Sequence, residues 1–117
     1  YMVKRNKGTI IFTGATASMR GGANFAAFAS AKNGLRALAQ SMARELGPKN
    51  IHVAHVIIDA AVDTEWIKSI HPEYDKKIKT DGIVNPSHLA ENYLYLYDQP
   101  RDAWTFELDL RPWQETW

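Results

Sequence analysis

The 117-residue sequence contains no cysteine, so it can form neither a disulfide framework nor a thiolate metal site. It has no apolar run near the roughly 20 residues that a membrane-spanning helix needs, and its first residues do not resemble a signal peptide. An excess of one charge is also lacking, because 14 basic residues against 13 acidic ones leave a net charge of +1. This balance predicts neither a nucleic-acid partner nor membrane binding, and the absence of cysteine fits a reducing, cytoplasmic compartment.

Four common active-site signatures are missing as well: G-x-G-x-x-G, the phosphate-binding G-x-x-x-x-G-K, G-x-S-x-G and H-E-x-x-H. His52 and His55 are three residues apart in a predicted strand, so their side chains should face opposite sides. A core or surface role is therefore favoured for them over a metal site. Asp59, Asp63 and Glu65 cluster in a loop, where carboxylates are usually solvated.

What the sequence does contain is an alternation of strand-like and helix-like segments. Residues 9–13 and 51–58 are apolar runs without alternation, which is typical of strands covered on both faces. A helical pattern over 25–46 joins them, so the three segments predict a βαβ unit with parallel strands. A second helix is predicted over 86–97. Residues 104–111 alternate strictly between apolar and polar, which indicates a half-exposed strand at a sheet edge.

The chain shows no internal repeat, no low-complexity stretch and no linker that would divide it. Residues 65–81 are charged, with irregular apolar spacing, and we interpret them as a mobile helical flap. The sequence therefore predicts one α/β domain over residues 1–117, which is long enough for one modest core.

The segment 25–46 is the longest helix in the prediction. Asn24 is expected to cap its start, and Gly47-Pro48 is a good stop signal. Apolar residues recur along it at three- and four-residue steps: Phe28, Ala31, Leu35, Leu38, Met42 and Leu46. Seven alanines leave much of its surface flat, which permits close approach by another helix. That helix could belong to a second subunit or to the same chain, and both interpretations stay open.

In an open parallel sheet, ligands bind at the carboxyl ends of the strands. Residues 13–24, 59–64 and the flap are predicted to lie at that edge. Phe28 and Lys32 follow the first of these segments and are one helical turn apart, so an aromatic ring and an ammonium share one helix face. From its spacing alone, Lys32 could contact a ligand or, as is more common for a lysine near a helix start, could be solvated.

Residues 8–64 carry a series of short motifs in a definite order. They are the strand 9–13, a small-residue loop, Phe28-Ala-Ser-Ala-Lys32 where a Y-x-x-x-K motif would stand, Leu35, Ala43-Arg44-Glu45-Leu46-Gly47, and a strand leading to Val62-Asp63-Thr64. In this order and spacing the segment resembles the carboxyl-terminal half of the short-chain dehydrogenase/reductase family. The remaining residues resemble that family's substrate lid and last sheet strand. The resemblance implies a partial Rossmann-like, doubly wound parallel sheet, made of the last three strands with their flanking helices.

The resemblance also implies a chemistry and a site. In the family, NAD or NADP exchanges hydride with a carbonyl or alcohol carbon of a small-molecule substrate. A tyrosine is the acid/base, a lysine lowers its pKa and holds the nicotinamide ribose, and a serine positions the substrate oxygen. Lys32 matches the lysine, Phe28 stands at the tyrosine position, and the serine position is Ala15. The serine's role would then pass to a nearby hydroxyl, on Thr13, Thr16 or Ser18. The implied cofactor-binding residues are Thr13, Gly14, Lys32, Val62 and Thr64.

Several features depart from the family's pattern. Phe28 cannot exchange a proton, which is expected to cost roughly 10²–10⁴-fold in rate. Asp59-Ala60 replaces the family's Pro-Gly. The family's amino-terminal half, with its glycine-rich dinucleotide loop, is not among the matched segments. We therefore expect weak cofactor binding by this chain alone and an open edge on strand 9–13.

Three hypotheses follow. The first is a nicotinamide-dependent oxidoreductase of which this chain is a piece, favoured by the abrupt start at Tyr1. The second is a catalytically impaired relative that serves as an oligomerising or ligand-binding module. The third is a truncated product that is stable only as a homo-oligomer, formed through the helix 25–46.

Overall fold

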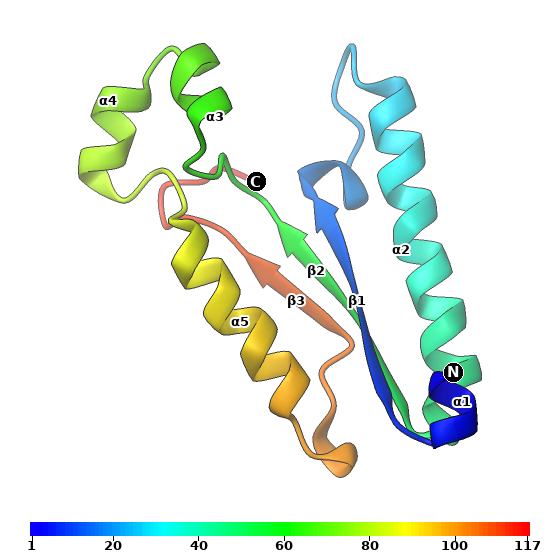
Figure 1. The fold of residues 1–117 in the computed structure, drawn as a ribbon. Helices are drawn as coiled ribbons and strands as arrows, with labels where there is room; N and C mark the ends of the chain where they lie inside the picture. The colour runs from blue at the N-terminus through cyan, green and yellow to red at the C-terminus, as the bar shows by residue number, and fades with distance from the viewer.

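The computed structural model describes all 117 residues and contains a single three-stranded sheet (Figure 1). Its strands are β1 (Gly8–Ala15), β2 (Ile51–Ile58) and β3 (Glu107–Leu110), in the order β1-β2-β3. Both neighbouring pairs run parallel. The predicted α/β fold with a partial, Rossmann-like parallel sheet is confirmed, including the position of the last strand at a sheet edge.

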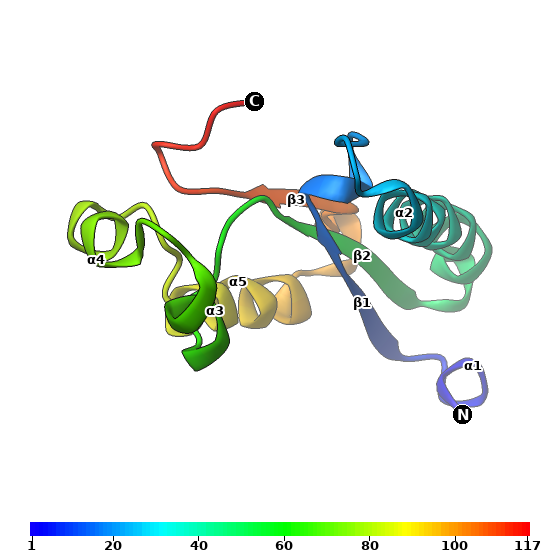
Figure 2. The same cartoon turned by 90° about the horizontal axis from the view of Figure 1, so that it is seen from above.

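The helices lie on both faces of this sheet. They are α1 (Met2–Arg5), α2 (Ala26–Leu46), α3 (Glu65–Ile70), α4 (Tyr74–Lys77) and α5 (Pro86–Asp98), with short 3₁₀ turns at Thr16–Ser18, Gly47–Lys49, Ile78–Thr80 and Arg101–Ala103. Seen from above, α2 covers one face and α5 the other (Figure 2). None of the helices combines the length and the apolar character required to cross a membrane.

The helix α2 connects β1 to β2 and packs against both strands. Its buried residues are Ala29 and Ala39, whose small side chains allow a close approach to the sheet. Phe28 and Leu38, which belong to the predicted apolar stripe, remain 47% and 49% exposed. The side of α2 that carries these two residues is therefore not covered by the chain itself.

The main core lies between the sheet and α5. Ala54 and Val56 of β2 and Leu96 of α5 are completely buried. Five partly buried residues pack around them: Ile11, Ile58, Tyr93, Leu108 and Leu110. Burial of this apolar surface, at about 25 cal/mol per Å², holds α5 on the sheet.

Two element boundaries differ from the sequence prediction. Asn24 does not cap α2, because it adopts a left-handed conformation (φ 69°) and Phe25 occupies the N-cap position without a side-chain hydrogen bond. The last strand begins at Glu107 rather than at residue 104. The reason is local, since the Thr105 amide donates to Oε1 of Gln99 at 2.7 Å instead of joining the sheet.

The segment predicted as a flap is helical, as expected, and comprises α3, α4 and the turn that follows them. Thr64 caps α3 by accepting a hydrogen bond from the Ile67 amide at 3.2 Å. The Tyr74 hydroxyl donates to Oδ1 of Asp63 at 2.6 Å, and this hydrogen bond raises the pKa of Tyr74 to about 12. A parallel bridge between Val62 and Val84 ties the segment to the start of α5.

The two strand histidines face opposite sides, as predicted. His52 stacks on Trp104 with 4.9 Å between ring centroids, whereas Nδ1 of His55 lies 3.1 Å from Oε2 of Glu107 on the side of α2. Both are buried, and no three potential ligands among histidine, cysteine, aspartate and glutamate come together to hold a metal ion.

Candidate functional site

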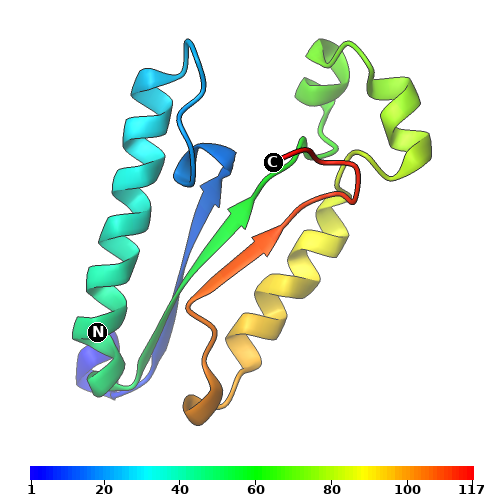
Figure 3. The same cartoon turned by 180° about the vertical axis from the view of Figure 1, so that it is seen from behind.

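The strands β1 and β2 end side by side, with Ala15 opposite Ile58 (Figure 3). The turn and loop that lead to α2 leave from β1 at this point, and residues 59–64 leave from β2. We call this region, which comprises residues 13–24, Lys32 and residues 59–64, the ligand edge. It is where the sequence predicts a binding site.

Lys32 reaches the end of β1. Its Nζ donates a hydrogen bond to the backbone oxygen of Thr13 at 3.0 Å and lies 5.9 Å from the centroid of the Phe28 ring. No carboxylate forms an ion pair with this ammonium. An ammonium has three donors, so two remain for hydroxyl groups of a ligand.

Thr13 and Gly14 are neighbours on β1, but the surroundings of their side-chain positions differ. The Thr13 hydroxyl is exposed and hydrogen-bonds the Tyr93 hydroxyl at 2.7 Å. Gly14 is buried, and a Cβ at this position would lie 2.2 Å from Nε2 of His55 and 2.7 Å from Oγ of Ser18. Only glycine fits here, so Gly14 lets the histidine ring pack under the end of β1.

The other two candidate hydroxyls are engaged within the protein. Ser18 is fully buried, and its Oγ accepts a hydrogen bond from the Ala15 amide at 3.0 Å. Thr16 is half-buried and donates its hydroxyl proton to Oδ1 of Asp59 at 2.5 Å. Thr13 is therefore the only exposed member of the three.

Val62 and Thr64 lie beyond β2 at the same edge. The bridge to Val84 uses the oxygen of Ala61 and the amide of Asp63, so the Val62 amide takes no part in it. Thr64 accepts from the Ile67 amide, which leaves its own hydroxyl proton to be donated elsewhere.

Asp59 departs from the sequence interpretation, which expected a solvated loop carboxylate. Its side chain is only 1% exposed. Besides Thr16, its partners are Arg20, whose Nη2 donates to Oδ2 at 3.1 Å, and Arg111, whose Nη1 lies 3.4 Å from Oδ2. Burial is tolerated because opposite charges and hydrogen bonds replace the lost water. The interpretation of Asp59 as solvated was wrong because these partners are distant in sequence.

A second ionic cluster was missed by sequence reasoning. Arg36 of α2 donates from Nε and Nη2 to the two carboxylate oxygens of Glu107, at 2.7 and 2.8 Å. These hydrogen bonds lower the pKa of Glu107 and raise that of Arg36, and Glu107 also contacts His55. No spacing rule links a helix position to a strand 71 residues away. The cluster joins α2 to β3.

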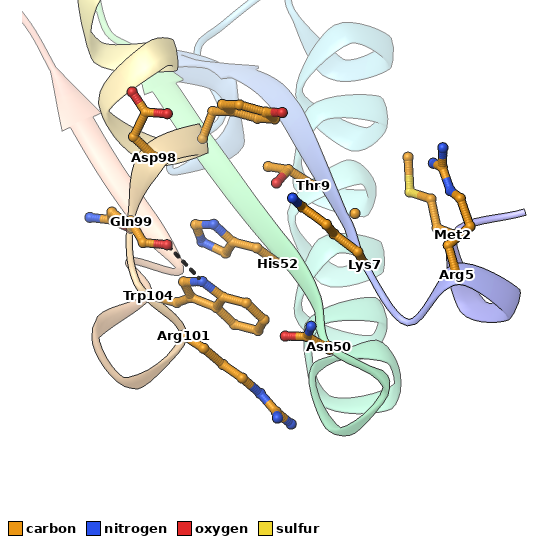
Figure 4. Close-up of a pocket in the computed structure, with 12 residues that line it drawn as sticks. Met2, Arg5, Lys7, Thr9, Asn50, His52, Asp98, Gln99, Arg101 and Trp104 are labelled. Atoms are coloured by element: carbon orange, nitrogen blue, oxygen red, sulfur yellow. Dashed lines mark hydrogen bonds between the residues drawn. The ribbon is translucent and has the colours of Figure 1, made fainter.

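The larger of two described pockets lies at the opposite end of the strands. It has a volume of about 920 Å³, and its lining includes Arg5, Lys7, Arg101 and the stacked pair His52 and Trp104 (Figure 4). A smaller pocket of about 370 Å³ lies beside the start of α5. Neither is lined by Lys32, so the candidate site rests on the side chains of the ligand edge and not on cavity size.

Comparisons with known proteins identify a family. A family model described as short chain dehydrogenase matches residues 1–75. The reductase MabA of Mycobacterium avium, a 3-oxoacyl-[acyl-carrier-protein] reductase, is 36% identical over 82 residues, which are 70% of this chain and 30% of that protein.

Solved structures give the same result. A short-chain dehydrogenase from Rhodopseudomonas palustris is 52% identical with a TM-score of 0.71, covering 96% of this chain and 42% of that one. A 7α-hydroxysteroid dehydrogenase, complexed with NADH and 7-oxo glycochenodeoxycholic acid, is 27% identical with a TM-score of 0.78, covering 94% of this chain and 45% of that one. The chain thus spans less than half the length of each of these relatives.

Proposed function

The chain belongs to the short-chain dehydrogenase family, and on that premise we propose that it acts in a nicotinamide-dependent oxidoreductase, where it supplies the residues that face the cofactor and the substrate. The cofactor is NAD or NADP, and the reaction is hydride transfer at a carbonyl or alcohol carbon of a small molecule. Relatives whose structures contain NADH or NADP⁺ support the class of cofactor. We also propose that the protein works in the cytoplasm, which fits the absence of cysteine.

The observation that carries this proposal is the position of Lys32. Its ammonium lies at the carboxyl end of a parallel strand, is bonded only to a backbone oxygen, and has no carboxylate partner. Two remaining donors suit the two hydroxyls of a ribose. The unused amide of Val62 and the hydroxyl of Thr64 suit a carboxamide at the same edge. The residues present therefore fit a nicotinamide riboside.

When bound, the cofactor gives or takes the hydride. The charge of Lys32 then stabilises the alkoxide that hydride transfer creates on a carbonyl oxygen. Phe28 offers no proton for that oxygen, although its ring contacts the lysine. Of the three candidate hydroxyls, Thr16 and Ser18 are engaged within the protein, and Thr13 is hydrogen-bonded to Tyr93 of α5, on the face of the sheet opposite α2 and Lys32. The structure therefore gives none of the three the positioning of the substrate oxygen. Gly14 lets the ring of His55 pack under the end of β1.

The test is a titration of the full chain with NADH and with NADPH, followed by the melting temperature. We expect a small rise for at least one cofactor, because binding to the folded state stabilises it. Lys32→Met should weaken binding by about tenfold or more, since hydrogen bonds from a charged donor are worth roughly 1.5–3 kcal/mol. Lys49→Met is the matched control, because Lys49 is an exposed lysine at the other end of α2. No shift with either cofactor would contradict the proposal.

A second candidate function is a non-catalytic, homo-oligomerising module. Two observations favour it. Phe28 stands at the position of the family's tyrosine. In addition, Phe28 and Leu38 of α2 both expose about half of their side chains. The proposed interface is the helix over residues 25–46. Sedimentation of the chain as a monomer at high concentration would count against this candidate.

A further inference from the structure

Arg20 is fixed at the ligand edge by a buried carboxylate. Asp59, 1% exposed, follows directly after β2 and is bonded by the hydroxyl of Thr16 and approached by Arg111. Arg20 donates from Nη2 to both of its oxygens, at 3.1 Å to Oδ2 and 3.4 Å to Oδ1. A carboxylate held from several sides keeps its position, and it therefore orients the guanidinium that it binds.

The guanidinium of Arg20 is engaged on one side only. Its Nε and Nη1 take part in no hydrogen bond, and the side chain is 41% exposed. Arg36 is different, because its Nε and Nη2 are both committed to Glu107. Arg111 is 19% exposed, and its guanidinium lies 4.2 Å from the ring centroid of Trp117. Arg20 is thus the arginine of this region that can still receive a ligand.

Exposed apolar side chains lie near Arg20 in the sequence. Met19 precedes Arg20 in the loop, and Phe25 and Phe28 begin the helix that the loop enters. They are 43%, 59% and 47% exposed, respectively. An oriented guanidinium on a loop with exposed apolar side chains matches an organic acid better than an inorganic ion, because both the charge and the carbon skeleton of the acid gain contacts.

We propose that Arg20 recognises the substrate of this oxidoreductase, and that the substrate carries a carboxylate on an apolar body. The inference rests on the proposed function. The free Nε–H and Nη1–H of Arg20 point in different directions, so a ligand carboxylate accepts a charge-assisted hydrogen bond from one of them, and Asp59 reduces the cost of ordering the side chain before the ligand arrives. A phosphate of the cofactor offers the same oxyanion chemistry, so the experiment has to separate the two sources.

The experiment follows the Arg20 Nε–H signal by NMR while the full chain is titrated with sodium benzoate and, separately, with benzamide, a neutral molecule of similar shape. Benzoate should shift this signal and benzamide should not. Arg20→Lys should weaken benzoate binding by about tenfold, because lysine keeps the charge but loses the planar guanidinium that Asp59 orients. Arg20→Gln, a second variant, should abolish the preference for benzoate. Arg44→Lys, at an exposed position on α2, should change nothing.

Equal responses to benzoate and benzamide would overturn the inference, as would unchanged benzoate binding in both Arg20 variants. A parallel NADH titration identifies the source of the anion. If Arg20→Lys weakens NADH binding as much as benzoate binding, the residue serves a cofactor phosphate and the inference fails. Benzoate binding through Arg20 in a chain that does not respond to NADH would support the anion site and overturn the proposed function alone.

Discussion

At the scale of single residues, Phe28 and Lys32 share a helix face but differ in what they contribute. Lys32 brings a positive charge to the end of β1, 3.0 Å from the Thr13 oxygen. Phe28 places its ring 5.9 Å from that charge and supplies no exchangeable proton. The pair therefore suits cofactor binding better than proton transfer.

Restoring a hydroxyl at position 28 tests this division. Phe28→Tyr is predicted to raise the reductase rate by about 10²-fold or more, because a nearby ammonium favours the phenolate and a placed acid speeds protonation. The ring is 47% exposed, so the added hydroxyl has room. The measurement is NADH oxidation with a panel of carbonyl compounds. Phe25→Tyr, at another exposed aromatic, is the control, and equal rates for all three proteins would exclude tyrosine-type chemistry at this position.

The two glycines Gly14 and Gly34 should respond oppositely to the same substitution. Gly14→Ala is predicted to destabilise the fold by about 1–3 kcal/mol, because the new Cβ would meet the ring of His55 and the hydroxyl of Ser18. Gly34→Ala meets nothing within 4 Å on α2 and should stabilise the fold by up to about 1 kcal/mol. Urea unfolding measures both. A Gly14→Ala protein as stable as wild type would show that β1 and His55 are not packed as described.

Some residue-level features could be predicted from the sequence and others could not. The proximity of Phe28 and Lys32 follows from one helical turn. The burial of Asp59 could not be predicted, because Thr16, Arg20 and Arg111 reach it from other segments of the chain. Local composition describes a loop, whereas the desolvation of a carboxylate depends on tertiary partners.

At the scale of elements, apolar periodicity was sufficient to identify the strands and the long helices. Periodicity did not predict the ends of these elements correctly, because single hydrogen bonds determine where an element begins. Thr105 leaves the last strand because its amide is taken by Gln99, and Asn24 turns the chain instead of capping α2. Spacing also gave no indication that Arg36 of α2 binds Glu107 of β3.

That ion pair predicts how the attachment of α2 to β3 depends on pH. Arg36 lowers the pKa of Glu107 below its ordinary 4.5 in the folded state, so the pair stabilises the fold above that value and loses its effect as pH falls through the lowered pKa. Glu107→Gln should therefore be less stable than wild type at neutral pH. The difference should shrink as the pH falls below 4.5 and through the lowered pKa of Glu107, below which both side chains are neutral.

Urea unfolding of both proteins, from neutral pH down to the lowest pH at which they still fold, gives this difference directly, and effects of the other carboxylates cancel in the comparison. A difference that stays constant over the whole range would show that Glu107 contributes through packing and not through its charge.

At the scale of the whole molecule, the sheet order places the candidate site and exposes one edge. β1 pairs only with β2, so its other side has no strand partner within this chain. The βαβ pattern was enough to predict which segments meet at the ligand edge. It could not predict that the larger pocket lies at the opposite end, because pocket lining depends on how α1, α5 and the turn after α5 pack.

We propose above that a nicotinamide cofactor binds at the ligand edge beside Lys32. The most direct test is to follow every backbone amide of the full chain by NMR during titration with NADH. We expect weak, saturable shifts, with a dissociation constant on the order of a millimolar. The largest shifts should fall on Gly14, Lys32, Val62 and Thr64. Shifts confined to the pocket around His52, or no saturable shift at all, would show that the cofactor does not bind beside Lys32.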